Sequence, residues 1–442
     1  MRAARRGAWA GVILALVVAG CTSTPEPSPT PSVDPCAAAV DAVTAAVRQY
    51  VALYDGTSTA SPSAQPSLQP SVQPSVQPSG GSAAPSAPTT SAPDAEAAAR
   101  ALDAAVATAQ AALNQGCARA DLSARLKASL AQVSATGVVA RAVRDRLVSN
   151  LTGTTRSEKV VEVGPGDDLV GLVATAASGA QLKLAKGTYR LPATLVLLDG
   201  ISIVGAGRSA TRLVSSAPDA AILVMAPSLV SLGDLTVSRD GGVGSVVVAG
   251  SATSTSLKDV RLGGARTGKG KQGGVGLDLT GPADATSPGR TTAMLTDVEL
   301  VDNSSTGLAV AGGHRASVVD SRFADNGDCG ACFLGAAEGS VQTSRFSDNG
   351  IAVAAMGTAS PVLEDNRISG GKVGIQAGDD ARPSISRTRI SAAKRAGVIF
   401  TGRSGGVLQD TTCVGLPVGI ALAKTALPSL KRNPSCSIAQ AK

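Results

Sequence analysis

Short apolar strands recur through the C-terminal two-thirds of the chain at a nearly fixed interval. Each repeating unit has a strand motif with one polar position, as in LGDLTV, LKDVRL or LEDNRI, and a second strand opened by glycine, as in GLAV, GACF or GIQA. The polar position falls at Asp234, Asp259, Asp297, Asp320, Thr343, Asp365, Arg387 and Asp410. These positions are 25, 38, 23, 23, 22, 22 and 23 residues apart, and an insertion within residues 263–290 accounts for the long step.

The period of the repeat predicts a parallel coil of stacked rungs. A unit of this length with no helix between its strands cannot bury its own apolar face, whereas stacked units can close a continuous core. Neighbouring rungs are then about 4.8 Å apart, the ordinary spacing between strands. Leucine-rich repeats have a similar period, but their regular leucine and asparagine frame is missing. We therefore expect a mainly β solenoid of about nine to ten rungs over residues 159–437.

Alternation along the glycine-led strands predicts which side chains face the interior. The expected inward positions are Leu308, Val310, Ile351 and Val353. The expected outward positions are Asp278, Ala309, Ala352, Gln376 and Ala421. The four phenylalanines are expected to point inward, so no aromatic side chain is left as a platform for a sugar ring.

Residues 36–152 carry helical spacing instead, with a low-complexity insert. The segment CAAAVDAVTAAVRQYVALY places its larger apolar residues on one stripe, and Asp34 can cap its start. Helical spacing resumes at Asp94 and ends at Gly116, and two shorter amphipathic runs follow. Residues 56–93 are rich in Pro, Ser and Gly and cannot bury a core, so we expect them to be disordered. The pattern predicts a small α-helical module ahead of the solenoid.

The first twenty residues have the pattern of an export signal, with a basic head followed by AWAGVILALVVA. They run into VAGC, which resembles a bacterial lipobox. The resemblance implies cleavage before Cys21, attachment of lipid to its thiol, and anchoring on the extracytoplasmic side of the bacterial cell membrane. The alternative is an ordinary signal peptide with a chance cysteine. Residues 21–35 are then a Pro/Ser-rich tether.

Charge and cysteine content follow from that assignment. Residues 1–20 hold three basic residues, so the mature chain carries +4 instead of +7, and no dense basic segment favours nucleic acid. Six cysteines remain, an even number that favours disulfides in an oxidising compartment. The expected pairs are Cys36–Cys117 across two antiparallel helices, Cys329–Cys332 as a staple across a turn, and Cys413–Cys436 one rung apart. The alternatives at CGAC are a free or functional thiol pair, such as a redox pair, or half of a zinc site.

The segment DDLVGLVATAASGAQLKLAKGTYRL, together with units such as LEDNRISGGKVGIQA, resembles the right-handed parallel β-helix of the pectate-lyase superfamily. The resemblance implies catalytic carboxylates, basic residues and calcium ligands on or beside the outer face of the first sheet. Only Asp278 fits such a site on the glycine-led strands, so the usual site is expected to be absent. One histidine and few methionines argue against the copper chemistry of some accessory β-helix proteins.

One column of basic residues is a candidate ligand surface. Arg322, Arg345, Arg367 and Arg389 each precede an inward residue on consecutive rungs, so all four are expected to point outward. Arg261 belongs to the same column, but Glu299 interrupts it. Such a column could hold an acidic polymer through bidentate contacts. The alternative is a solvated outer face with no ligand.

A second column consists of Asp302, Asp325 and Asp348, each followed by asparagine and one rung from the next. Stacked carboxylates raise a calcium site as one interpretation. The other is turn chemistry, in which the Asn amides bond to one another. His314 has no serine and carboxylate partners in the sequence that would make a catalytic set, so we expect a turn residue.

The sequence favours a lipid-anchored extracytoplasmic protein whose solenoid presents a long binding surface without catalysis. The candidate ligand is an acidic cell-envelope polysaccharide. One alternative is a polysaccharide lyase, hydrolase or epimerase with an atypical site at Asp278 or in the insertion. Another is an envelope assembly or sensor factor whose helical module binds a protein partner. No cofactor is expected apart from the calcium interpretation above.

Overall fold

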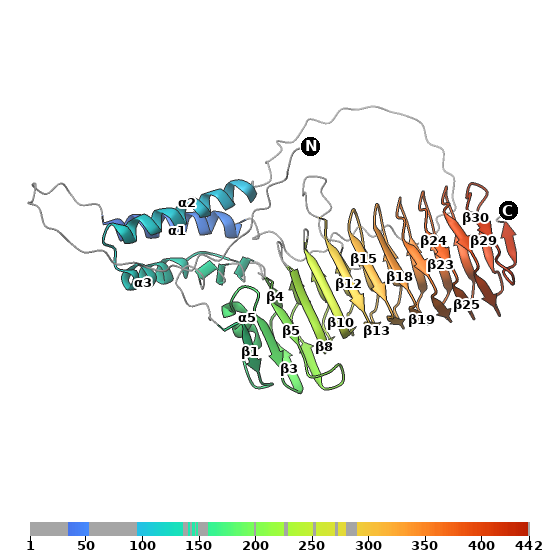
Figure 1. Ribbon diagram of the computed structural model, residues 1–442, viewed down its shortest axis with the longest axis horizontal. Coiled ribbons are helices and arrows are strands. Elements are labelled where there is room, and N and C mark those ends of the chain that lie inside the picture. Colours follow the sequence, from blue (N-terminus) through green and yellow to red (C-terminus); the bar gives the residue numbers. More distant parts are fainter. Residues whose placement is uncertain are drawn as a thin grey trace, which may run out of the picture.

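A computed structural model describes residues 34–52, 95–135, 140–141, 144–145, 147–148, 158–198, 200–224, 229–250, 253–269, 273–279 and 290–440. The expected signal peptide, Cys21, the tether up to residue 33 and the insert 56–93 lie outside the described residues. Two parts are visible in Figure 1, a group of helices and a long stack of strands.

The helical part consists of α1 (Pro35–Ala52), α2 (Ala95–Asn114) and α3 (Arg119–Leu130). Asp34 caps α1 as expected, because its Oδ1 accepts a hydrogen bond from the Cys36 N–H at 2.9 Å. An Arg125 guanidinium bonds the same carboxylate at 2.7 Å and lowers the pKa of Asp34. Cys36 and Cys117 form the expected disulfide, with their Cα atoms 5.3 Å apart. The apolar stripe of α1 is buried in a core shared with α3.

The stack of strands has three faces, and one of them is formed by the glycine-led strands. We call this face sheet 1. It contains β4 (Leu195–Leu197), β7 (Asp219–Val224), β9 (Gly244–Ala249), β11 (Val275–Leu279), β14 (Thr306–Val310), β17 (Cys329–Phe333), β20 (Ile351–Ala355), β23 (Val373–Ala377), β26 (Ala396–Phe400), β29 (Ile420–Leu422) and β31 (Ile438–Gln440). All its ladder pairings are parallel.

The other two faces are joined into one 20-stranded sheet by β8 (Leu229–Arg239) and β10 (Ser254–Gly263), which run through both. Sheet 2 adds β1 (Val160–Val163), β2 (Gln181–Leu184), β5 (Ser202–Val204), β12 (Thr292–Thr296), β15 (Arg315–Val319), β18 (Glu338–Gln342), β21 (Val362–Glu364), β24 (Ser384–Ser386), β27 (Val407–Gln409) and β30 (Ser429–Lys431). Sheet 3 adds β3 (Gly187–Leu191), β6 (Thr211–Ser215), β13 (Glu299–Val301), β16 (Arg322–Ala324), β19 (Arg345–Ser347), β22 (Arg367–Ser369), β25 (Arg389–Ser391) and β28 (Thr412–Val414).

The recurring polar position of the sequence is the bend between sheets 2 and 3. All eight residues at this position have a φ between 45° and 56°, the left-handed region. Aspartate adopts this conformation more readily than most residues because its short side chain bonds to the local backbone. The repeat therefore marks where the chain must turn, rung after rung.

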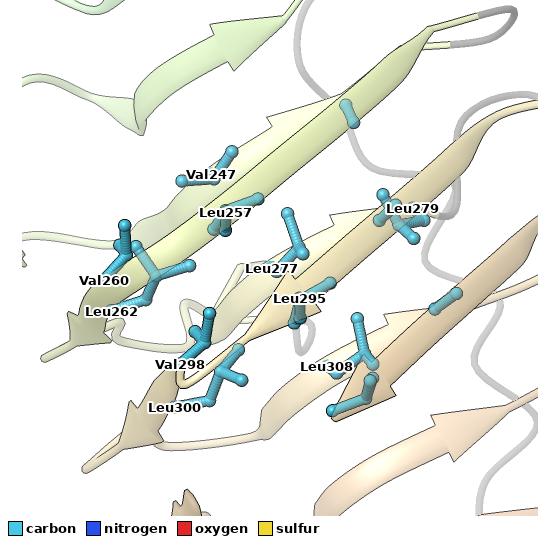
Figure 2. Close-up of a cluster of buried hydrophobic side chains, with 14 of the residues drawn as sticks. Val247, Leu257, Val260, Leu262, Leu277, Leu279, Leu295, Val298, Leu300 and Leu308 are labelled. Atoms are coloured by element: carbon cyan, nitrogen blue, oxygen red, sulfur yellow. The ribbon is translucent and has the colours of Figure 1, made fainter. Parts of the chain in front are cut away.

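The interior of the coil is a single apolar core (Figure 2). Leu308, Val310 and Val353 belong to it, and so do all four phenylalanines, of which Phe323 and Phe346 stack with ring centroids 4.6 Å apart. Each rung contributes residues in register with those of the next, so the core is a set of columns. Burial of these columns is the main favourable term that holds the rungs together.

Two of the predicted orientations are wrong, both at the start of β20. Ile351 lies on the outer face, where it packs with Cys329, Cys332 and Ala354, whereas Ala352 lies in the core. The register pairs Ile351 with Cys329 and then Val353 with Ala331, so the ladder skips the second residue of the strand. Simple alternation fails at this interruption and assigns the first two residues to the wrong faces.

The number of rungs was also underestimated. Sheet 1 has eleven strands within the described residues, against the predicted nine to ten rungs. The difference arises at both ends, because β4 and β7 lack the glycine-led motif and β31 lies beyond residue 437. Between these two ends, the strands follow the predicted period.

Both ends of the core are covered. α5 (Leu169–Thr175) lies at the first end and buries Leu169 and Val173 in the core, and Asp168 caps it by accepting from the Gly171 N–H at 3.1 Å. At the other end Cys413 and Cys436 form the expected disulfide, with Cα atoms 4.9 Å apart. The helical part packs on the outside of sheet 1, where Tyr50 and Leu147 contact Val196 and Leu223.

A column of asparagines stabilises the turn between sheets 3 and 1. The Asn303 Nδ2 donates to the Asn326 Oδ1 at 3.0 Å, and the Asn326 Nδ2 donates to the Asn349 Oδ1 at 2.8 Å. The amide oxygens also accept from the main chain of the preceding rung: the Asn303 N–H donates to the Asn326 Oδ1 at 3.3 Å. The stacked amide bonding expected from the DN repeats is confirmed.

We predict that Asn326→Ala lowers the free energy of unfolding by about 2–4 kcal/mol, because it leaves several buried polar groups without partners. Urea denaturation followed by circular dichroism measures this change. Asp325→Asn is the matched control, since the neighbouring side chain is exposed and Asn also tolerates its φ of 56°. Equal unfolding free energies for the two variants would contradict a structural role for the amide column.

Candidate functional site

The predicted arginine column is confirmed by the strand register of sheet 3. Arg322 pairs with Arg345, Arg345 with Arg367, and Arg367 with Arg389, each on the neighbouring rung. All four side chains are exposed on the outer face. We call these four residues the arginine row. The parallel register makes it a straight line of guanidinium-bearing residues at intervals of about 4.8 Å, the spacing between strands.

The arginines of the row have no carboxylate partner among the residues that the structure describes. Other exposed arginines of the β-helix do. Arg403 bonds Asp380 at 2.7 Å, Arg432 bonds Asp410 at 2.8 Å, and Arg387 bonds Glu364 and Asp365. Hydrogen bonding to Asp380 raises the pKa of Arg403, and bonding by Arg403 lowers the pKa of Asp380. The row differs because its rung neighbours are themselves arginines.

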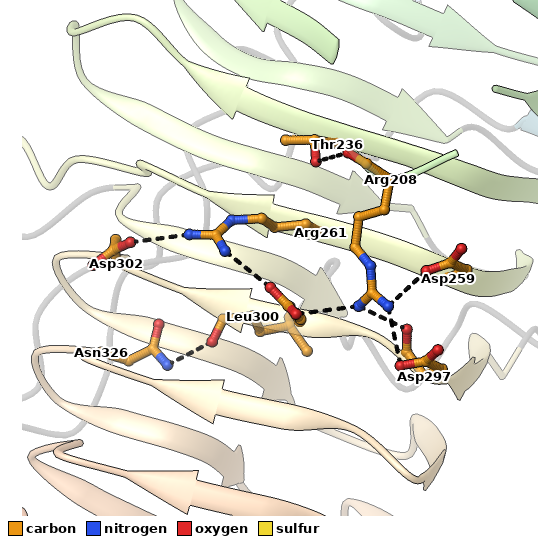
Figure 3. Close-up of polar contacts among 9 residues, drawn as sticks. Arg208, Thr236, Asp259, Arg261, Asp297, Leu300, Asp302 and Asn326 are labelled. Atoms are coloured by element: carbon orange, nitrogen blue, oxygen red, sulfur yellow. Dashed lines mark hydrogen bonds and ion pairs between the residues drawn. The ribbon is translucent and has the colours of Figure 1, made fainter. Parts of the chain in front are cut away.

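The row ends at an ion-pair network on its N-terminal side (Figure 3). Glu299 pairs in register with Arg322, and its Oε2 accepts from Arg261 at 2.9 Å. Arg261 also approaches Asp302 at 3.5 Å. On the C-terminal side the next residue in the column is Thr412, which pairs with Arg389. A carboxylate, Glu299, therefore ends the row on one side, and a neutral residue, Thr412, ends it on the other.

The network contains residues that the sequence did not reveal as a group. Arg208 contacts Asp259 at 2.6 Å, Asp297 at 3.2 Å and Glu299 at 3.4 Å. Asp259 and Asp297 were recognised only as repeat markers. Arg208 lies in an early turn outside the repeat pattern, so no spacing in the sequence connects it with them. One signal in the sequence could have indicated this group. Asp234, Asp259 and Asp297 occupy successive bends, and a cation is needed to offset the repulsion among their stacked carboxylates.

The carboxylate of Asp259 is electrostatically unusual. Partial burial raises its pKa, and the negative charges of Asp297 and Asp234 raise it further, whereas Arg208 lowers it. An acid with a raised pKa is a feature of proton-transfer sites, but ion-pair networks produce it too. Here Arg208 directly contacts Asp259, Asp297 and Glu299, which favours a structural role for the network.

Asp278, the expected catalytic candidate, lies on the outer side of sheet 1 between Val248 and Ala309. Its side chain is only 3% exposed. Ala309 and Gln376 share its outward column as expected, and the register places Ala421 there too. Of the insertion, residues 270–272 and 280–289 lie outside the described part of the chain. Asp278 lies on sheet 1 and the arginine row lies on sheet 3, so the fold does not bring them together.

Asp302, Asp325 and Asp348 occupy the first position of the turn between sheets 3 and 1. Their φ values are 57°, 56° and 54°, so the left-handed turn gives each of them a backbone role. Across the described ranges, no group of three or more His, Cys, Asp or Glu side chains is placed to hold a metal ion. Calcium binding by these aspartates is the untested alternative interpretation of the column.

The remaining chemical candidates have structural surroundings. Cys329 and Cys332 form the expected disulfide, but it lies along β17 on the outer face instead of across a turn. His314 is 5% exposed, and its Nδ1 accepts from the Thr291 N–H at 3.2 Å. Arg315 and Glu338 approach within 3.5 Å as an exposed pair.

Comparison with known proteins agrees with this geometry. Residues 287–433 match the family described as the right handed beta helix region. The C-terminal part of this chain is a right-handed parallel β-helix. The matched stretch spans β12 to β30 and so includes the arginine row. A comparison with curated protein sequences gave no match.

Solved structures share the β-helix at low sequence identity. ORF18 of Geobacillus virus E2 aligns with a TM-score of 0.50 and 13% identity, over 68% of this chain and 64% of that one. Pectate lyase Pel9A aligns with a TM-score of 0.34 and 14% identity, over 66% and 80% of the two chains. The A-module of the Azotobacter vinelandii mannuronan C-5 epimerase AlgE6 aligns with 0.31 and 13%, over 62% and 93%. The alignment thus spans less than two-thirds of the viral protein, and the likeness shows the fold alone.

No described helix of the chain is long and apolar enough to span a membrane. The expected anchor at Cys21 lies outside the described residues. Lipid attachment therefore stays a prediction from the sequence.

We predict that Arg208→Gln raises the pKa of Asp259 further, and that Asp297→Asn lowers it, because the first change removes an attractive charge and the second a repulsive one. Carboxyl carbon NMR of the labelled protein reports both shifts. Since the folded pKa is already raised, the contribution of Asp259 to stability is largest at low pH and is lost as pH rises through that value. Unchanged titration in both variants would refute the contacts in Figure 3.

We also predict that millimolar Ca²⁺ leaves the melting temperature unchanged, because the turn conformation and the Arg261 contact account for the aspartate column. Differential scanning calorimetry with Ca²⁺ and then with EDTA is the measurement. A rise in melting temperature that Asp325→Asn abolishes would instead establish a calcium site.

Proposed function

We propose that this protein is a lipid-anchored extracytoplasmic β-helix that binds an acidic cell-envelope polysaccharide along the arginine row, without catalysis. The anchor at Cys21 and the tether of residues 21–35 hold it at the membrane. The β-helix provides a rigid, regular surface, so the protein itself loses little conformational entropy when a long polymer binds.

The observation that carries the proposal is four consecutive exposed arginines with no carboxylate partner among the described residues. Two unit charges separated by one rung repel by about 1 kcal/mol even in water. Arg403 and Arg432, elsewhere in the β-helix, are instead neutralised by aspartates of the neighbouring rung. A row left unpaired gains most from an anionic ligand, and guanidinium groups bind carboxylates in bidentate geometry.

The surroundings of the row support binding instead of bond cleavage. Glycoside hydrolysis needs two carboxylates on either side of the scissile bond. Glu299, the carboxylate that follows the row in register, is held by Arg261 and Arg208. All four phenylalanines are buried in the core, so none of them offers a platform for a sugar ring.

The raised pKa of Asp259 favours a second candidate, a polysaccharide lyase, hydrolase or epimerase that uses the network at the end of the row. This activity would release new reducing or unsaturated ends from an acidic polysaccharide, and Asp259→Asn would abolish the release. Binding with no new ends favours the first proposal.

We predict that Arg345→Ala/Arg367→Ala weakens binding of an acidic polysaccharide by about tenfold to a hundredfold, since it removes two charge-assisted contacts from the middle of the row. A glycan array identifies the ligand for the full-length chain in detergent, and titration calorimetry then compares the variants.

Arg403→Ala/Arg432→Ala is the matched control, because it removes the same net charge from exposed arginines that already have partners. Equal affinity of wild type and the Arg345/Arg367 variant would reject the proposal. Equal loss in the two double variants would show a general charge effect and reject it as well.

A further inference from the structure

We infer that the bound polymer lies parallel to the β-helix axis and carries one anionic group for each of four successive rungs. This inference rests on the proposed function and adds the direction, the charge spacing and the length of the recognised segment. The ligand class is a linear polyanion with a charge on every repeating unit, as in a homopolymer of hexuronic acid.

The direction follows from the charges that flank the row. A polymer lying across β16 would meet exposed Asp320 on one side of Arg322 and exposed Asp325 on the other. Across β19 it would meet exposed Asp348, and across β22 exposed Asp365. Along the axis no acidic residue intervenes between Arg322 and Arg389, because the four arginines are direct register partners. Across β25 it would meet Arg387 and Ala392 but only one arginine of the row. The axial path alone contacts all four arginines with no acidic residue between them.

The charge spacing follows from the parallel strands. Rungs repeat at about 4.8 Å, so the anchor points of the row have that interval. A hexuronic acid unit advances its chain by a comparable length and carries one carboxylate. A polymer in which a charged sugar alternates with a neutral one would match only every second arginine. The row therefore selects for continuous charge.

The length follows from the ends of the column. On one side Glu299 would repel the next anionic group, and Arg261 is already engaged by Glu299 and Asp302. On the other side Thr412 offers no charge. Three exposed cationic residues lie beside the C-terminal half of the row, on the turn between sheets 3 and 1. They are Lys372, Lys394 and Arg395, and they form no ion pair among the described residues. Four charged units fill the row.

The test uses oligouronates of two to eight residues, titrated into the full-length chain in detergent. Affinity of the wild type is expected to rise about threefold to tenfold for each added residue up to four, and to change little beyond. Thr412→Arg adds a fifth arginine in register with Arg389 and is expected to move the plateau from four residues to five. Arg322→Gln is expected to move the plateau from four residues to three. This second variant keeps the test valid if Thr412→Arg does not fold.

Ser429→Arg is the control for the added charge, because Ser429 is exposed on sheet 2, outside the row. Its plateau is expected to stay at four residues. Oligosaccharides in which uronate alternates with a neutral sugar are expected to bind at least tenfold more weakly than oligouronates of equal length. Equal affinity for the two series would overturn the charge spacing.

The outcomes separate this inference from the proposed function. If binding needs Arg345 and Arg367 but the plateau is the same in wild type, Thr412→Arg and Arg322→Gln, the axial alignment is wrong and the binding function stands. If no oligouronate binds but another acidic polysaccharide from the array binds and needs Arg345 and Arg367, the inferred ligand class is wrong and the binding function stands. If binding ignores Arg345 and Arg367, both fail together.

Discussion

Parallel, in-register stacking of the rungs is the constraint on which the rest of this structure depends. Each rung is hydrogen-bonded to the next through its main chain, so every side chain has a counterpart about 4.8 Å away on both sides. A residue type is therefore repeated as a column, and its interactions are multiplied by the number of rungs. Columns that attract one another stabilise the coil, and columns that repel must be neutralised by something else.

The columns of this protein show each solution. Apolar residues stack in the core, where Phe323 lies on Phe346. Asparagine amides donate to the next amide, from Asn303 to Asn326 and on to Asn349. Aspartates at the bends alternate with arginines at the C-terminal rungs, as Asp410 does with Arg432. The four residues of the arginine row have no such neutralisation among the described residues.

Much of this could be predicted from the sequence because stacking turns spatial neighbours into a fixed sequence interval. The period located the bends, the Cys413–Cys436 disulfide and the arginine row, since each depends on residues 22–23 apart. The other two disulfides followed from the ends of two helices and from local spacing. The exceptions lie where the period or the alternation breaks. Ile351 and Ala352 flank an interruption of the ladder, and the outermost rungs lack the motif. Arg208 reaches Asp297 across 89 residues from a turn outside the repeat, so no interval connects them.

The same logic separates the length of the fold from the length of the candidate site. The coil ends where its core is covered, by α5 at one end and beside the Cys413–Cys436 disulfide at the other. The arginine row is much shorter, and its limits are set by Glu299 and Thr412, which have no part in closing the core. Outward positions of a β-helix can therefore change one rung at a time without cost to the columns inside. A surface of this kind specifies its ligand through the order of charges along the axis.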